Sequence, residues 1–118
     1  MPKPTKPLGN LGEELALQHL LAKGYRLRAR NTNLRFSEAD LVVEKADSVV
    51  LVEVKTTTDH QFLYPQELVH QKKQAKLRRL AGLLAQEYPT KKIRIDVVAI
   101  EMTVPPTITH LENAVEGS

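Results

Sequence analysis

The chain has 118 residues, a length that fits one domain around one hydrophobic core. Hydrophobic residues make up 42% of the chain and charged residues 26%, which excludes collagen-like, coiled-coil and largely disordered classes. With 17 Lys and Arg against 14 Asp and Glu, the net charge of +3 allows a polyanionic partner without requiring one.

Two features that the sequence lacks exclude further classes of functional site and of protein. The sequence contains no cysteine, so disulfides, thiolate metal sites and a cysteine nucleophile are excluded. The longest apolar run, residues 49–52, has four residues, whereas a membrane-spanning helix needs roughly 20. The basic N-terminus leads into no apolar signal core, so we expect a cytoplasmic protein without membrane contact.

The first part of the chain predicts an arm, a helix and a strand. Prolines at positions 2, 4 and 7 indicate an extended arm over residues 1–8. Residues 8–23 are typical of an amphipathic helix, and Gly24 can end it in a left-handed conformation. Residues 25–31 predict a half-buried strand, because Tyr, Leu and Ala alternate with arginines at 26, 28 and 30 that form a basic outer face.

The remaining elements follow from the same patterns. Residues 39–44 and 48–55 are β-rich and flank a short turn, as in an antiparallel hairpin, and the polar residues 56–64 indicate a loop. Pro65 opens and Pro89 closes a helical stretch with a leucine-rich stripe. A strand over residues 92–101 precedes a candidate edge strand at 107–111 and a tail at 115–118. We therefore expect one α/β domain over residues 9–114, a mixed sheet with helices on its faces and the order α-β-β-β-α-β, with a final edge strand as an option.

Two acids that interrupt apolar strands are the main candidates for chemistry. If the hairpin closes about Ala46 and Asp47, counting outward pairs Asp40 with Glu53 on one face, with Cβ atoms about 5 Å apart. Lys55 shares that face because side chains alternate along a strand. Carboxylates so close repel unless a proton or a cation relieves them, and oxygen ligands suit Mg²⁺ or Mn²⁺. On spacing alone, an ordinary surface arrangement is equally consistent with these residues.

Three other polar residues each allow either a functional or a structural interpretation. Glu13 extends the apolar side of the first helix toward the sheet, yet it could merely complement the helix dipole. Lys73 extends the stripe of the second helix, although a lysine stem can also leave a core edge. Asp96 interrupts its strand and suits either a buried hydrogen bond or catalysis. The histidines at 19, 60, 70 and 110 have no helical spacing that predicts a zinc site.

These positions resemble a known family. The residues that carry the resemblance are Gly9-x-x-Gly12-Glu13, Gly24-Tyr25, Asn31, Glu38-Ala-Asp40-Leu41, Val52-Glu53-Val54-Lys55-Thr56, Pro65-x-Glu67, Lys73-x-x-x-Leu77, Asp96-Val97-Val98-Ala99 and His110-x-Glu112-Asn113-Ala114. Over about residues 9–114 the chain resembles the YraN-like family of small bacterial predicted endonucleases. That family is a branch of the PD-(D/E)XK restriction-endonuclease-like superfamily, which also contains archaeal Holliday-junction resolvases.

The resemblance implies a restriction-endonuclease-like core and hydrolysis of nucleic-acid phosphodiesters with Mg²⁺ or Mn²⁺, branched DNA being one candidate substrate. By resemblance, Asp40 and Glu53 are the metal-binding acids, Lys55 is the lysine of the superfamily signature, and Glu13 is the first-helix acid that assists metal or water; all four are catalytic. The chain departs from the family at two places. Residues 36–37 are Phe-Ser where Gly-Gly is usual, and Thr57 stands where an arginine is usual.

Nucleic acid is the expected partner, with DNA favoured over RNA. The candidate phosphate contacts are Arg35, Lys72, Lys73, Lys76 and Arg79. A nuclease of this size that cuts two strands needs a homodimer or two visits. Two alternatives stay open: a nucleic-acid-binding module with an inactive nuclease-like site, and a scaffold in which the acids are structural.

Overall fold

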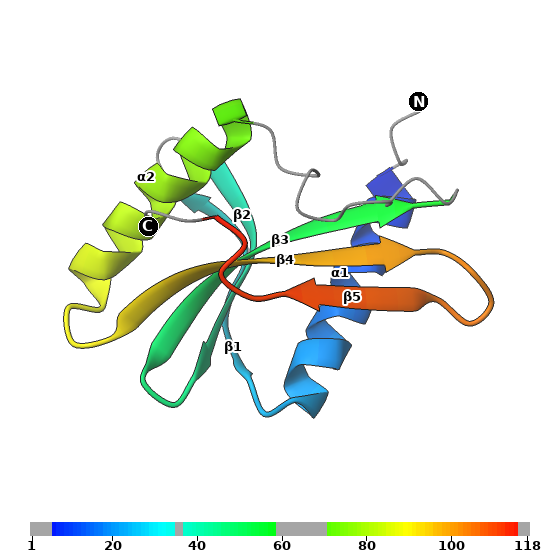
Figure 1. Cartoon of the computed structure of the whole chain (residues 1–118), viewed down its shortest axis with the longest axis horizontal. Helices are drawn as coiled ribbons and strands as arrows, with labels where there is room; N and C mark the ends of the chain where they lie inside the picture. Colours follow the sequence, from blue (N-terminus) through cyan, green and yellow to red (C-terminus); the bar gives the residue numbers. More distant parts are fainter. Residues whose placement is uncertain (1–5, 35–36, 59–70, 116–118) are drawn as a thin grey trace.

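One mixed sheet lies between two helices in the computed structural model, which describes residues 6–34, 37–58 and 71–115 (Figure 1). The elements are α1 (Lys6–Ala22), β1 (Arg26–Leu34), β2 (Ser37–Lys45), β3 (Ser48–Thr57), α2 (Gln71–Glu87), β4 (Lys92–Glu101) and β5 (Thr107–Leu111). The strand order is β1-β2-β3-β4-β5. β3 and β4 run parallel because α2 connects them, and the other neighbours are antiparallel. The predicted mixed α/β class and element order are confirmed, including the edge strand β5.

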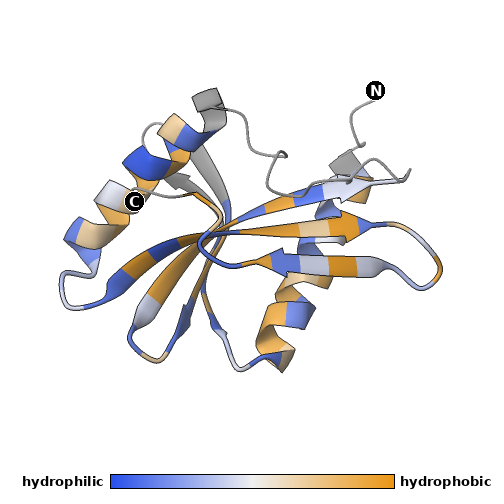
Figure 2. Cartoon of the chain, viewed as in Figure 1, coloured by the Kyte–Doolittle hydropathy of each residue, from blue (hydrophilic) through white to orange (hydrophobic). Residues whose placement is uncertain are grey.

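Each helix packs against its own face of the sheet. α1 buries Ala16, Leu17 and Leu20 against strand residues that include Leu41, Val43, Val50, Val52, Val98 and Ile100. α2 buries its predicted leucine-rich stripe against Val42, Val49, Leu51, Ile95 and Val97. Adjacent residues of a strand therefore enter different cores, as the pleat requires. In Figure 2, apolar residues recur along β4 and on both helices. Within the described ranges, no helix is long and apolar enough to cross a membrane.

Several element boundaries differ from the prediction. α1 begins at Lys6, with Pro7 in its first turn, where the missing N–H of proline breaks no helical hydrogen bond. β1 and β2 are longer than predicted because they pair out to Leu34 and Ser37. β3 continues through Thr57 because β4 pairs with it that far, so the predicted loop starts too early. The predicted helix start at Pro65 lies outside the described residues.

β1 lacks the single basic face that its alternation predicted. Its pairing with β2 shifts register at Arg28, which is the extra residue of a β-bulge. Arg26 and Arg28 each lie 3.5 Å from Glu44 of β2, whereas Arg30 pairs with Glu14 of α1 at 2.7 Å. The prediction of one basic outer face is therefore wrong, because a bulge breaks the period of two on which it rested.

The sheet divides at one end, where β2 and β3 diverge (Figure 1). These strands pair from Lys45 opposite Ser48 to Leu41 opposite Val52. Beyond that point β2 continues beside β1, and β3 continues beside β4. We call the diverging segments, residues 37–40 of β2 and 53–57 of β3, the fork.

Candidate active site

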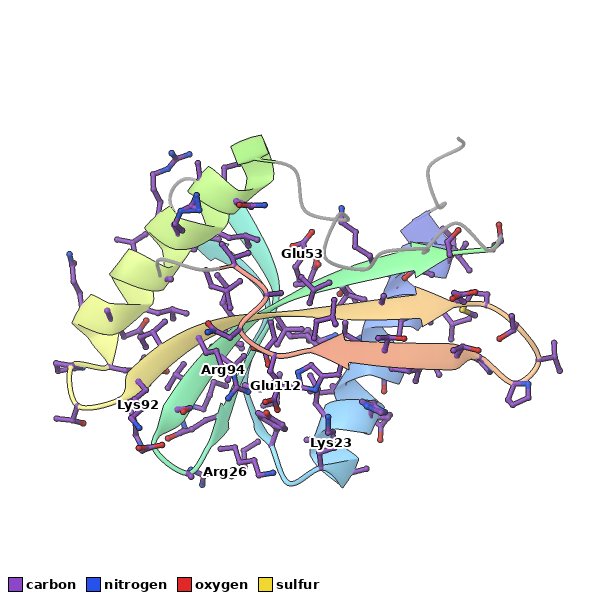
Figure 3. All side chains as sticks on the ribbon, in the orientation of Figure 1. Lys23, Arg26, Glu53, Lys92, Arg94 and Glu112 are labelled. Atoms are coloured by element: carbon purple, nitrogen blue, oxygen red, sulfur yellow. The ribbon has the colours of Figure 1, made fainter. Side chains whose placement is uncertain are left out.

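Asp40 and Glu53 occupy the first positions beyond the paired part of β2 and β3. The register predicted from the turn, Lys45 opposite Ser48, is confirmed, but the paired part ends at Leu41 opposite Val52, so the predicted direct pairing of Asp40 with Glu53 is not part of it. Both acids alternate with Leu41 and Val52, which are buried on the α1 face, so they belong to the α2 face. Figure 3 shows Glu53 where the two strands separate.

Asp40 is anchored to the opposite strand of the fork. Its Oδ2 accepts a hydrogen bond of 2.8 Å from the backbone N–H of Val54. In a continuous antiparallel pair, such an N–H would find a backbone carbonyl; where the strands diverge, the carboxylate takes that role. The divergence of the sheet thus fixes Asp40 against β3.

Glu53 and Lys55 form an ion pair on β3. Lys55 Nζ lies 3.7 Å from Glu53 Oε1, and the two side chains are 37% and 6% exposed. A buried carboxylate needs a charged or hydrogen-bonding partner, and Lys55 supplies positive charge from the solvent side. Lys55 is therefore placed to meet both a buried acid and an incoming anion.

Glu13 reaches this region from the other side of the sheet. Gly12 lies against Thr56, and a Cβ at position 12 would overlap the Thr56 side chain, so glycine is what lets α1 approach β3 so closely. The close approach brings Glu13 to an open depression of about 190 Å³, lined by Gly9, Glu13, Val54, Lys55 and Thr56. The Oε1 atom of Glu13 is buried. The four predicted catalytic residues thus gather around the short segment 53–55.

The donor set of the fork fits a hard divalent cation. Asp40 and Glu53 present carboxylate oxygens, and Mg²⁺ is commonly bound through one or two carboxylates with water and phosphate oxygens completing its shell. Among the described residues, no three Asp, Glu or His side chains form a metal-binding group. Within the described part of the chain, a cation at the fork would therefore have Asp40 and Glu53 as its protein ligands, and water or substrate oxygens could complete its shell.

Of the predicted nucleic-acid contacts, the structure describes the side chains of two. Lys76 and Arg79 are exposed on α2, outside its buried stripe. Arg35 lies outside the described residues, as do the side chains of Lys72 and Lys73, whose backbone belongs to α2.

Asp96 belongs to a closed cluster on the α1 face, which favours the hydrogen-bonding interpretation over the catalytic one. Its fully buried carboxylate accepts hydrogen bonds from Arg94 Nε (2.8 Å) and Nη2 (3.0 Å), His110 Nε2 (2.7 Å) and the N–H of Asn113 (2.9 Å). Burial raises the pKa of Asp96, but the bonds from His110, Arg94 and Asn113 together outweigh it, and the pKa lies below its ordinary value. Every lone-pair direction is used by a fixed donor.

Sequence reasoning missed two contacts that build the site. The anchoring of Asp40 by the Val54 N–H had no local signal, because it arises from the divergence of two strands. The approach of Gly12 to Thr56 did have one: Gly12 precedes the buried Ala16 by one helical turn, on the side of α1 that faces the sheet.

Comparison with known proteins points to one family. The model of the family described as "Uncharacterised protein family UPF0102" matches residues 12–100, which include all four residues around the fork. A UPF0102 protein of Clavibacter michiganensis is 46% identical over 95 residues, covering 79% of this chain and 80% of that protein. One from Syntrophomonas wolfei is 41% identical over 113 residues, covering 93% and 98%. One from Thermodesulfovibrio yellowstonii is 38% identical over 111 residues, covering 91% and 94%.

Proposed function

Since this chain belongs to the uncharacterised protein family UPF0102, we propose for it, from its own geometry, the metal-dependent hydrolysis of nucleic-acid phosphodiesters. The observation that carries the proposal is the convergence at the fork: Asp40 is anchored at Val54, and Lys55 lies 3.7 Å from the buried Glu53. The same convergence supports placing the chain in the PD-(D/E)XK superfamily, whose signature these strands resemble.

Each residue at the fork has a role in this proposal. Asp40 and Glu53 would hold Mg²⁺ or Mn²⁺, an ion that when bound makes water a better nucleophile and offsets charge on phosphate. The Lys55 ammonium positions the attacking water, favours the loss of its proton to solvent and stabilises the charge that develops on the phosphate. Glu13, which lines the same depression as Lys55, assists in orienting the water.

The reaction is a displacement at phosphorus. The water oxygen forms a bond to phosphorus while the bond to the 3′ oxygen breaks, and the leaving oxygen takes up a proton. The products are a 5′-phosphate and a 3′-hydroxyl. We propose that the substrate is DNA, branched or linear, and that the protein is cytoplasmic. Where both strands are cut, we propose that a second copy of the chain takes part.

A cleavage panel with a lysine variant tests the proposal. The wild type should cut at least one of single-stranded, duplex, flapped and four-way DNA when Mg²⁺ or Mn²⁺ is present, and none when EDTA is added. Lys55→Ala should bind DNA within a few-fold of the wild type but cleave it about 10² or more times slower, the usual scale for a positioned catalytic group. Lys92→Ala, an exposed lysine at the other end of the sheet, is the matched control and should cleave normally.

Calorimetry tests the ion separately. Glu53→Gln keeps the shape of the side chain but removes its charge, so Mn²⁺ binding should be lost, whereas the exposed Glu14→Gln should leave the isotherm unchanged. An unchanged isotherm in Glu53→Gln would remove the metal assignment. A wild type that binds DNA but cuts nothing in the panel would be a binding module with an inactive site.

A further inference from the structure

A second set of cations surrounds Glu44, at the end of the sheet away from the fork. Arg26 Nη2 and Arg28 Nε each lie 3.5 Å from Glu44 Oε1, and Lys91 Nζ lies 2.8 Å from Oε2. We call these four residues the Glu44 cluster. Within the cluster, three positive charges and one negative charge leave a surplus of two, and the nearby Glu87 offsets part of the charge of Arg28. Figure 3 shows Arg26 at the bottom of the view, away from Glu53 near the centre.

The surplus charge faces solvent. The Glu44 side chain is 7% exposed, whereas that of Arg26 is 73% exposed and those of Arg28 and Lys91 are about a third exposed or more. The neighbouring pair of Lys92 and Asp47 is different, because it has one charge of each sign and both are exposed. The cluster therefore presents a positive surface over a buried acid.

Two of the three cations of the cluster have further contacts that hold them in place. Lys91 Nζ also donates a hydrogen bond of 3.2 Å to the carbonyl of Ala46, and the Arg28 guanidinium lies 5.7 Å from the centre of the Tyr88 ring. The hydrogen bond from Lys91 lowers the pKa of Glu44, so the acid stays ionised and continues to attract the three cations. Side chains that are already ordered lose less entropy when they bind a ligand.

The cluster also lies at a useful distance from the fork. Glu44 and Asp40 are four residues apart on β2 and on the same face of the strand, which corresponds to about 13 Å at 3.3 Å per residue. A DNA strand carries one phosphate for about every 3.4 Å of helix axis, so the separation corresponds to about four base pairs. The direct path between the two places passes Val42, which α2 covers, so a duplex that contacts both runs beside α2.

We propose that the Glu44 cluster is a second contact for the backbone of duplex DNA, about four base pairs from the phosphate held at the fork. This inference rests on the proposed function, but it concerns binding and is tested without cleavage. The alternative is that cations on the edge strand β1 serve only to discourage pairing with other strands.

Salt-dependent binding separates these two roles. Anisotropy of a labelled DNA duplex, measured in EDTA over a series of KCl concentrations, gives the slope of log affinity against log salt. Arg26→Gln with Arg28→Gln should flatten that slope by about 1.8, since each phosphate contact contributes about 0.9. Lys92→Gln removes an exposed cation at the same end and should leave the slope unchanged. No change in the double variant, or an equal change per charge in Lys92→Gln, would overturn the inference.

A second variant does not depend on removing the cations. Glu44→Gln keeps all three cations, and the contacts of Lys91 with Ala46 and of Arg28 with Tyr88 still order two of them. Because the negative charge beside them is removed, this variant should bind the duplex more tightly than the wild type at every salt concentration. Asp47→Asn makes the same change in net charge at an exposed site and should bind more weakly than Glu44→Gln. Equal binding by these two variants would count against the cluster. If the wild type cleaves DNA but none of these substitutions alters DNA binding, this inference alone is overturned. If the wild type neither binds nor cleaves DNA, the proposed function is overturned with it.

Discussion

The Asp96→Asn variant tests how much a buried carboxylate contributes to the stability of this fold. Oδ1 of Asp96 accepts from Arg94 Nε and the N–H of Asn113, and Oδ2 accepts from Arg94 Nη2 and His110 Nε2. Asparagine keeps the shape but turns one acceptor into a donor, which then faces other donors. Arg94, which also donates to the Tyr25 hydroxyl at 2.6 Å, loses its nearest counter-charge and keeps only the longer ion pair with Glu112 at 3.9 Å.

The expected loss of stability is large because the acid is fully buried. Removing one partner of a buried ion pair costs about 3–5 kcal/mol, against a total of about 5–15 kcal/mol for an ordinary domain. Urea unfolding followed by far-ultraviolet circular dichroism measures the difference. Asp47→Asn, which removes an exposed acid 3.4 Å from Lys92, is the control and should cost less than about 1 kcal/mol. Equal losses in the two variants would refute the reasoning.

The same pair of proteins has a predictable pH dependence. The pKa of Asp96 is lower in the folded state than the unfolded value of about 3.9, so the carboxylate contributes its full stability above that value. The contribution is lost as the pH falls through the folded-state pKa, because the wild-type side chain then also becomes neutral. The gap between wild type and Asp96→Asn should narrow as the pH falls below about pH 4. A gap that widens below that pH would contradict this assignment of charge.

Two further changes have signs set by the structure. Gly12→Ala should lower the free energy of unfolding by about 1–3 kcal/mol, because its Cβ overlaps the Thr56 side chain, and Thr56→Ala in the same chain should restore part of the loss in urea unfolding. Gly82→Ala on α2, where a Cβ meets nothing within 4 Å, should instead stabilise by up to about 1 kcal/mol, so equal signs would contradict the close packing of α1. Neutralising Lys76 and Arg79 should flatten the salt slope of DNA binding by about 1.8, and an unaltered slope would make that side of α2 an ordinary solvated surface.

Features with a local cause could be predicted from the sequence. The two-residue turn at Ala46 and Asp47 sets Lys45 opposite Ser48, and this register places Asp40 and Glu53 one residue beyond the paired part of each strand. The leucine stripe of α2 and the β4 strand followed from periods of 3.6 and 2. Such patterns reflect which side of an element meets the core, and this needs no knowledge of the rest of the chain.

Features that depend on distant segments could not be predicted. The bulge at Arg28 depends on how β1 meets β2, and it redirects the arginines that alternation had placed on one face. The partners of Asp96 come from three places, the neighbouring Arg94, His110 of β5 and the N–H of Asn113, and no spacing in the sequence links them. The sequence shows that Asp96 interrupts an apolar strand, but it does not show which groups donate hydrogen bonds to that carboxylate.

Asp96 and Glu53 show how two similar acids on neighbouring strands can serve different ends. Glu53 faces the α2 side and pairs in register with Val97, next to Asp96, which faces the α1 side. The donors to Asp96 include a backbone N–H and the buried His110, neither of which can move away without unfolding the local structure. Glu53 instead pairs with Lys55, whose side chain is 37% exposed and ends on a flexible stem. An ammonium group of that kind can turn toward a phosphate while the fold stays intact, so chemistry is expected at Glu53 and not at Asp96.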